Sequence, residues 1–370
     1  MFKIVFLGDF CVENASSLAL GEGLKQIVEN CIFKVCNFEA PIKVTGAKSI
    51  IKSGPAIEQP QNSADFLTRN GFNVLLLANN HMMDYGDEGL ETTLRAFDKQ
   101  VTVGAGDRPY DVKICSYDDT KVGFLALSQF EFGIVKSDEV KRNGVAWVCD
   151  NRIGDIIRTA KSKVDYLFVC PHAGIEDIFA PLPEWREQYR YFIECGADAI
   201  IATHPHTPQG WEVYKGKYIF YSLGNFCFDL GNPATEPFFN KGLCVEMLID
   251  NNGIKCSPRA VCYDGRLIDV DNSQGISSHI NYLNHLLSDK DDYDLYLDSE
   301  CKKMYSFYKY GLLRSLKGYS CGLGIRESIK LFLANIIKKE EYPFLLNAFQ
   351  CESHRWFIER YINIKLGKDS

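Results

Sequence analysis

The chain has 370 residues, of which 46% are hydrophobic, 13% aromatic and 24% charged, and its net charge is −7. This composition is that of a globular protein long enough for two or more domains, and it argues against a disordered chain, a collagen-like repeat or a coiled-coil rod. The charges of both signs are interspersed, so neither a nucleic acid nor an anionic membrane is an expected partner.

Up to about residue 265, short apolar runs rich in β-branched residues alternate with longer amphipathic stretches, a pattern typical of an α/β domain. It predicts strands at 3–7, 33–38, 74–78, 121–127, 166–170, 199–202 and 218–222. It predicts helices at 65–70, 88–99, 152–162 and 184–194, the last of them closed by Gly196. Two further strands, 242–250 and 254–263, flank Asn251-Asn252-Gly253, which indicates a β-hairpin.

From about residue 271 onward the apolar spacing becomes helical, so we expect an α/β domain over 1–268 and a helical C-terminal extension over 269–370. The helical pattern rests on Ile280, Leu283, Leu286, Leu287, Ile329, Leu331, Phe332, Ile336 and Ile337. We expect this extension to pack as a cap on the sheet domain, and a membrane-surface or partner helix is the alternative. Its aromatic group is expected to be core or interface, with a sugar-binding platform as the alternative: Tyr305, Phe307, Tyr308 and Tyr310.

The cysteines and the apolar segments bear on the expected compartment. The 14 cysteines are too sparse for a secreted disulfide scaffold, and no C-x-x-C pair suggests a zinc or redox site. The apolar run at the start is too short for a signal peptide, and no later run is long enough to span a bilayer. We therefore expect a soluble, cytoplasmic protein.

Polar residues follow directly after six of the predicted strands. They are Gly8-Asp9, Asn37-Phe38-Glu39, Asn79-Asn80-His81, His172, His204-Pro205-His206 and Gly224-Asn225. Because ligands of open α/β sheets bind beyond the carboxyl ends of the strands, these groups are expected to converge on one pocket. Their carboxylate, amide and imidazole groups suit zinc, manganese or iron. The extended backbone favoured before proline would hold His204 and His206 near one locus.

These residues and their order resemble the CapA-type proteins of bacterial capsule and poly-γ-glutamate synthesis over roughly residues 2 to 250. The resemblance rests on Gly8-Asp9, Asn37 to Ile42, Ser53-Gly54-Pro55, Ala78 to Gly86, Gly104 to Gly106, His172 to Glu176, His204 to His206 and Tyr221 to Phe226. It implies a calcineurin-like metallophosphoesterase fold, an α/β four-layer αββα sandwich, to which the C-terminal helical extension is added.

The resemblance also implies a role for each polar group. One or two divalent metal ions would be held by Asp9, Glu39, Asn80, His172, His204 and His206. His81 would be the proton donor, oriented by Asp84. Four further residues are expected to touch substrate or to position the ligands: Asn37, Asn79, Glu176 and Asn225. For Glu176, orientation of His172 from a helical segment and a plain surface position are both open.

The chain departs from the pattern of related phosphoesterases directly after its first expected metal ligand. Those proteins begin with Asp-x-His, whereas Phe10-Cys11 follow Asp9 here, so one imidazole ligand is missing. The leading prediction is a metal-dependent hydrolase or transferase acting on an anionic polymer or on a small phosphorylated or γ-glutamyl substrate. The alternative is a non-catalytic component that binds a polymer or the proteins of a synthase complex.

Overall fold

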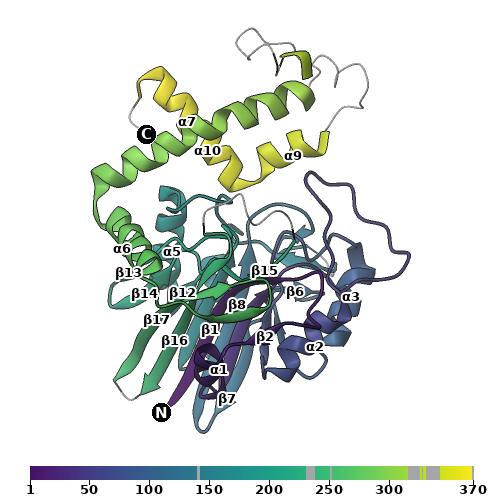
Figure 1. Cartoon of the computed structure of the whole chain (residues 1–370), viewed down its shortest axis with the longest axis vertical. Coiled ribbons are helices and arrows are strands. Elements are labelled where there is room, and N and C mark those ends of the chain that lie inside the picture. The colour runs from purple at the N-terminus through teal and green to yellow at the C-terminus, as the bar shows by residue number, and fades with distance from the viewer. Residues whose placement is uncertain are drawn as a thin grey trace.

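Two β-sheets form the body of the molecule (Figure 1) in the computed structural model, which describes residues 1–139, 142–230, 238–250, 252–315, 326, 328–330 and 342–368. The larger sheet contains β1 (Phe2–Cys11), β2 (Ala19–Leu20), β3 (Phe33–Phe38), β4 (Val74–Leu76), β5 (Val101–Val103), β15 (Asn225–Phe228), β16 (Lys241–Asp250), β17 (Gly253–Tyr263) and β18 (Leu267–Val270). Its order is β2-β18-β17-β16-β1-β3-β4-β5, and β15 also pairs with β1. The strands β1, β3, β4 and β5 are parallel, so their carboxyl ends share one edge.

The second sheet contains β7 (Lys113–Tyr117), β8 (Thr120–Ser128), β11 (Tyr166–His172), β12 (Ala199–Ile201), β13 (Trp211–Tyr214) and β14 (Lys217–Phe220). Its order is β13-β14-β12-β11-β8-β7, with β8, β11, β12 and β14 parallel. A small third sheet contains β6 (Ala105–Gly106), β9 (Ile134–Val135) and β10 (Gly144–Ala146).

The two large sheets share an aromatic core. The ring of Phe6 in β1 lies 5.1 Å from that of Phe168 in β11 and 6.3 Å from that of Phe124 in β8. Helices α1 (Glu22–Glu29), α2 (Gln61–Arg69) and α3 (Gly86–Ala96) pack with the larger sheet, and α4 (Ile153–Lys161) and α5 (Pro183–Cys195) pack with the second. This arrangement confirms the predicted α/β sandwich of two central sheets flanked by helices.

The predicted strands and helices of the sheet domain are confirmed, with shifted boundaries. α2 begins at Gln61, four residues before the predicted start, because Pro60 supplies an extended backbone at the helix N-cap. Gly196 closes α5 with φ +119°, a conformation that glycine adopts without strain. β16 and β17 form the predicted hairpin, although Asn251 of its turn lies outside the described residues. The small third sheet, the helix α1 and six strands of the two large sheets were not predicted, namely β2, β5, β7, β13, β15 and β18.

The helices after β18 lie across the end of the molecule opposite the N-terminus (Figure 1). They are α6 (Gln274–Ser288), α7 (Lys290–Ser315), α9 (Tyr342–Gln350) and α10 (Glu352–Leu366). β18 crosses the predicted domain boundary at 268 and 269, and Leu331, Phe332, Ile336 and Ile337 lie outside the described residues. Among the helices described, none combines the length and the hydropathy needed to cross a bilayer.

Candidate metal centre and adjoining pocket

Asp9 is held at the end of β1 by an irregular backbone that depends on Gly8. The pairing of β1 with β3 shifts register just before Asp9, and the Asp9 amide donates a 3.0 Å hydrogen bond to the carbonyl of Gly224. A Cβ at residue 8 would lie 1.7 Å from that carbonyl oxygen, so the approach requires glycine. The buried Asp9 carboxylate accepts hydrogen bonds from Asn37 Nδ2 at 2.7 Å and from the His204 amide at 3.1 Å.

Glu39, directly after β3, places a carboxylate in the same buried region. Its Oε1 makes no hydrogen bond to the described residues, and it lies 3.7 Å from Nε2 of His206 and 3.9 Å from Nε2 of His172. Ligand atoms of Asp9, Glu39 and His172 all lie within 4.8 Å of one another. A buried carboxylate oxygen without a hydrogen bond is costly in a dry site, so this oxygen fits a bound cation.

His172, the last residue of β11, faces polar partners through both ring nitrogens. Its Nε2 lies 3.0 Å from Oδ1 of Asn80 and 3.1 Å from Nδ1 of His204. Its Nδ1 lies 3.0 Å from Oγ1 of Thr203. The structure therefore brings the predicted amide ligand Asn80 and two of the predicted imidazole ligands into contact, although they come from three separate segments.

The segment His204-Pro205-His206 does not have the extended backbone that the proline predicts. His204 has φ +104° and His206 has φ +57°, both in the region that disfavours residues with a side chain. The expectation was wrong because the tertiary hydrogen bond from the His204 amide to Asp9 outweighs the local preference. Such backbone strain costs about 1–3 kcal/mol per residue and is found mainly at functional sites.

His81 lies beside this centre as one member of a buried charged group. Its Nδ1 is 2.7 Å from Oδ2 of Asp84, the partner that the sequence predicts. Lys52, which the sequence analysis did not predict, lies 2.5 Å from Oδ1 of Asp84 and 3.1 Å from Nδ1 of His81, and its side chain is only 4% exposed. Since Asp84 accepts a hydrogen bond from Nδ1, the imidazole presents its Nε2 as the remaining polar atom.

The predicted asparagines connect the strand ends to one another. Asn79 Nδ2 donates a 3.1 Å hydrogen bond to Oδ1 of Asn37, and Asn79 Oδ1 accepts one of 3.2 Å from the His81 amide. Asn225 Oδ1 lies 3.0 Å from Nδ1 of His206. The three amides therefore hold the carboxylate and imidazole groups in place and leave little freedom for side-chain rotation.

Glu176 stands apart from this hydrogen-bonded group. The residues after His172 form a bend and a turn, and no helix brings Glu176 back to the imidazole. The side chain is exposed and lines the pocket described below. Glu176 therefore does not orient His172 in this structure.

Several polar residues of the site were not found from the sequence. They are Lys52, Gln129, Glu131, Thr203 and His354. Lys52 precedes the Ser53-Gly54-Pro55 motif, which was a usable signal, and Gln129 and Glu131 follow the end of β8 as the predicted ligands follow their strands. Cys11, at the position where related phosphoesterases have histidine, packs against Ala40 and Phe228.

Burial shifts the titration of the central groups. It raises the pKa of Asp9 and, to a greater extent, that of Glu39, and it lowers the pKa of His204 to about 4. Burial alone would also lower the pKa of His206, but the neighbouring carboxylates Glu39 and Asp9 raise it to about 9. A dry group of carboxylate, amide and imidazole donors fits a divalent cation of the manganese, zinc or iron type.

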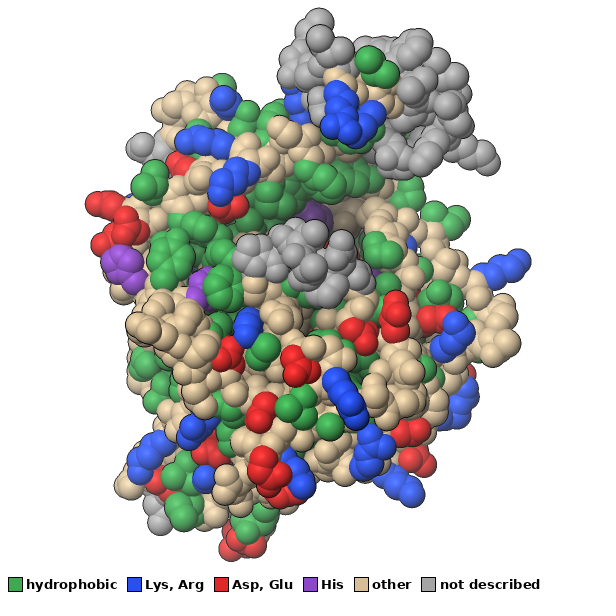
Figure 2. Space-filling model, viewed as in Figure 1, with side chains coloured by type: hydrophobic (Ala, Val, Ile, Leu, Met, Phe, Trp, Pro, Cys, Tyr) green, Lys and Arg blue, Asp and Glu red, His purple; other side chains and the backbone are tan. Residues whose placement is uncertain are grey.

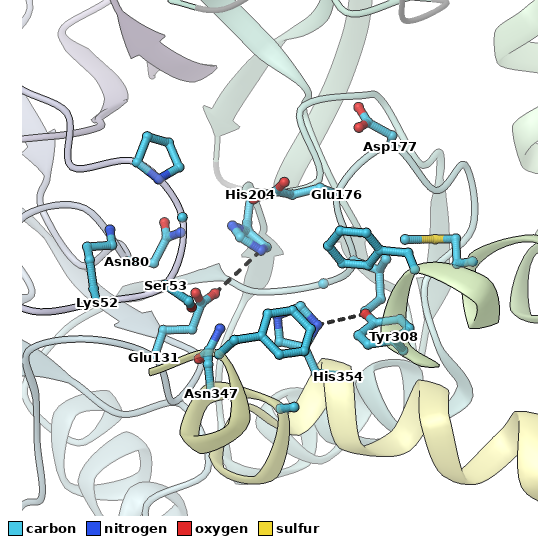
Figure 3. Close-up of a pocket in the computed structure, with 18 of the residues that line it drawn as sticks. Lys52, Ser53, Asn80, Glu131, Glu176, Asp177, His204, Tyr308, Asn347 and His354 are labelled. Atoms are coloured by element: carbon cyan, nitrogen blue, oxygen red, sulfur yellow. Dashed lines mark hydrogen bonds and ion pairs between the residues drawn. The ribbon is translucent and has the colours of Figure 1, made fainter. Parts of the chain in front are cut away.

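A cavity of about 330 Å³ adjoins the centre on the side of the helical extension (Figure 3). Asn80, His81 and His204 line it from the sheet domain, and Tyr308 and His354 line it from α7 and α10. Figure 2 shows hydrophobic side chains gathered beneath the extension around a hollow in which a histidine is visible. The members of the predicted aromatic group differ in burial: Tyr308 is buried, whereas Phe307 is 61% exposed at this cavity.

Comparison with known proteins gives a family match. Residues 4–230 match the family model described as bacterial capsule synthesis protein PGA_cap. A Bacillus anthracis protein named capsule biosynthesis protein CapA is 34% identical over 211 residues, which are 54% of this chain and 51% of the relative. A Bacillus subtilis protein named PGA biosynthesis protein CapA is 36% identical over 249 residues, 62% of this chain and 64% of the relative. The chain thus spans half to two thirds of the length of these relatives.

The similarity to solved structures is weaker. The structure of an NAD nucleotidase from Haemophilus influenzae aligns with a TM-score of 0.39 and 14% identity, covering 74% of this chain and 58% of that one.

Proposed function

Since this chain belongs to the bacterial capsule synthesis family PGA_cap, we propose that it is a metal-dependent hydrolase or transferase of cell-envelope polymer synthesis. The polymer is capsular polysaccharide or poly-γ-glutamate, and the bond is a phosphate ester, an amide or a similar bond that forms an oxyanion during reaction. The substrate is an anionic polymer or a small phosphorylated or γ-glutamyl molecule. Proteins of a synthase complex are the expected partners.

One observation carries this proposal: the unpartnered Oε1 of Glu39 lies where carboxylate and imidazole groups meet. We assign as metal ligands Asp9, Glu39, Asn80, His172, His204 and His206. Bound there, one or two divalent cations of manganese, zinc or iron would polarise the scissile bond and lower the pKa of a coordinated water. The mixed oxygen and nitrogen donors suit these metals better than they suit magnesium or calcium.

His81 is the proposed proton donor to the leaving atom. Asp84 accepts the hydrogen at Nδ1 of His81 and so fixes the ring, which leaves Nε2 to face the substrate. Lys52 neutralises Asp84 through its 2.5 Å contact, and it thereby keeps this buried carboxylate from acting as an unpaired negative charge. The sheet domain excludes water from the centre, because every assigned ligand is at least 90% buried.

The cytoplasmic location is also part of this proposal. All cysteines that the structure describes are free, and many of them are buried in the strands. Free buried thiols are typical of a reducing compartment.

Metal analysis of the full chain tests the proposal. Protein purified without chelator and supplied with manganese or zinc is expected to bind about one or two ions per chain, and Asp9→Asn and His206→Ala are expected to lower this number. Asp107→Asn, a change at an exposed carboxylate, is the matched control and should retain the wild-type metal content. Metal content near zero in all four proteins would remove the metal mechanism.

The second candidate is a non-catalytic component that binds a polymer or a synthase partner. The replacement of a ligand histidine by Cys11, which packs among apolar side chains, favours it. A panel of phosphoesters and γ-glutamyl amides with added manganese or zinc separates the two candidates. Turnover that is lost in His81→Ala, with metal content unchanged, would contradict a role in binding alone.

A further inference from the structure

The cavity beside the centre has walls of unequal charge. The carboxylates of Glu131 and Glu176 line it on the side of the sheet domain. Among the described lining residues, Lys52 is the one lysine or arginine, and its ammonium group is ion-paired with Asp84. A row of anionic groups in this cavity would therefore meet the carboxylates of Glu131 and Glu176, and the described part of the lining offers it no lysine or arginine besides the paired Lys52, which is unfavourable in a partly desolvated space.

The opposite wall is largely apolar and comes from the C-terminal helices. Met304 and Phe307 of α7 and Phe344 and Ala348 of α9 line the cavity, and the rings of Phe307 and Phe344 are 6.0 Å apart. Phe307 is 61% exposed, so a ligand that covers it removes apolar surface from water. This wall favours a group with an aliphatic or aromatic body.

Specific hydrogen bonds fix this wall on the sheet domain. Glu352, at the start of α10, accepts hydrogen bonds from the Phe130 amide at 2.8 Å and from Trp147 Nε1 at 2.7 Å. On the cavity side, His354 Nδ1 lies 2.7 Å from the hydroxyl of Tyr308, which ties α10 to α7 (Figure 3). The cavity is therefore a built part of the molecule and not a gap between loosely placed helices.

We propose that this cavity binds the substrate group on the far side of the reacting bond, that this group is uncharged or cationic with an apolar body, and that α7, α9 and α10 determine its selection. This inference rests on the proposed metal centre. A volume of about 330 Å³ is near the lower limit for ligand pockets, so it suits a single monomer-sized group derived from an amine or an alcohol. The reacting bond then joins an anionic unit of the substrate to a non-anionic group, and it does not lie between two anionic units. The helices that line the cavity lie beyond residues 4–230, which match the family model.

Three hydroxamates that differ only in their tails test the inference, because a hydroxamate binds a metal ion without any reaction. Their tails are butyl, aminobutyl and carboxypropyl, and binding to the manganese-loaded full chain is measured by calorimetry. The butyl and aminobutyl compounds are expected to bind about fivefold to tenfold more tightly than the carboxypropyl compound. Equal binding of the three, or tighter binding of the carboxypropyl compound, would overturn the inference.

Two pairs of variants test which wall of the cavity causes the preference for one hydroxamate tail over another. Glu176→Gln should reduce the advantage of aminobutyl over carboxypropyl, while Glu187→Gln, at an exposed position on α5, should leave it unchanged. Phe307→Ala should weaken binding of the butyl compound, while Phe349→Ala, on the exposed face of α9, should not. If both members of a pair behave alike, that wall does not contact the tail and its part of the inference fails.

The same titrations separate this inference from the proposed function. Manganese that binds to the wild-type chain but not to His206→Ala, together with hydroxamates that show no tail preference, would overturn the inference and leave the metal centre standing. A wild-type chain that binds no manganese would overturn the proposed function, and the inference with it.

Discussion

Ser353, at the start of α10, donates a 2.6 Å hydrogen bond to Oε1 of Gln129, which follows the end of β8. The other end of the same amide, Nε2, lies 2.9 Å from Nε2 of His204. A residue of the last helix is thus two hydrogen bonds away from a proposed metal ligand. The C-terminal helices consequently support the candidate centre in addition to forming a wall of the pocket.

Replacement of Ser353 by alanine should destabilise the protein. Ser353 is fully buried and also accepts a 2.9 Å hydrogen bond from Trp185 Nε1, so the variant leaves this buried indole without its partner and leaves Gln129 Oε1 with the Gly174 amide alone. The expected loss in the free energy of unfolding is about 1–3 kcal/mol, measured by urea denaturation. Ser162→Ala, at the partly exposed end of α4, is the control and should change it by less than about 0.5 kcal/mol. Equal stabilities would mean that this contact does not hold α10.

The effect of Glu39→Gln on stability should depend on whether metal is present. In chelator, the variant is expected to be as stable as the wild type or more stable, because it removes the charge of a buried carboxylate whose Oε1 makes no hydrogen bond, while Asp9 remains 3.7 Å from Nδ1 of His206 to balance that imidazole. With excess manganese, the wild type should gain in melting temperature and the variant should gain much less, since binding to the native state alone raises its stability. Glu91→Gln, an exposed change on α3, should follow the wild type in both conditions. A variant that is destabilised in chelator would contradict the assignment of Glu39 as a metal ligand.

Gly8→Ala is expected to be among the most damaging single substitutions in the sheet domain. The added Cβ would lie 1.7 Å from the carbonyl oxygen of Gly224, and relief of this clash must move β1 and Asp9. We expect a loss of more than about 3 kcal/mol in the free energy of unfolding, or failure to fold. Gly275→Ala in α6 has no atom within 4 Å of its new Cβ and should be neutral or stabilising. Thermal unfolding of both variants checks the contrast.

Glu212 should contribute to stability in a pH-dependent way. Burial alone would raise the pKa of Glu212, but hydrogen bonds from Arg190, Tyr221 and Arg186 lower it from 4.5 to about 2. Because the folded-state pKa is the lower one, the stabilisation is fully present above about pH 5 and is lost as the pH falls towards 2. Glu212→Gln should thus cost about 2–3 kcal/mol near neutral pH and almost nothing at the acid end. Urea denaturation of wild type and variant across this range measures the difference, and a difference independent of pH would contradict it.

The longest strands of the sheet domain could be predicted because their signal is local. Runs such as those of β3 and β11 are mostly apolar and almost entirely buried, and burial on both faces selects that composition. The polar residues after them were predictable for a related reason, since parallel strands end at a common edge. This placed Asp9, Glu39 and His172 among the expected neighbours.

The remaining features depend on contacts between distant segments, which no local pattern encodes. The positive φ angles of His204 and His206 oppose the local preference and persist because the Asp9 carboxylate binds the His204 amide. Lys52 became part of the site through a loop that folds back onto Asp84, and Ser353 through a helix more than two hundred residues beyond Gln129. The amino-acid sequence thus determined where the longest strands form and which chemical groups stand at their ends, because both follow from short-range sterics and burial. Only the tertiary structure decided which of those groups touch, and that the C-terminal helices form a wall of the pocket, because those outcomes depend on the packing of the whole chain.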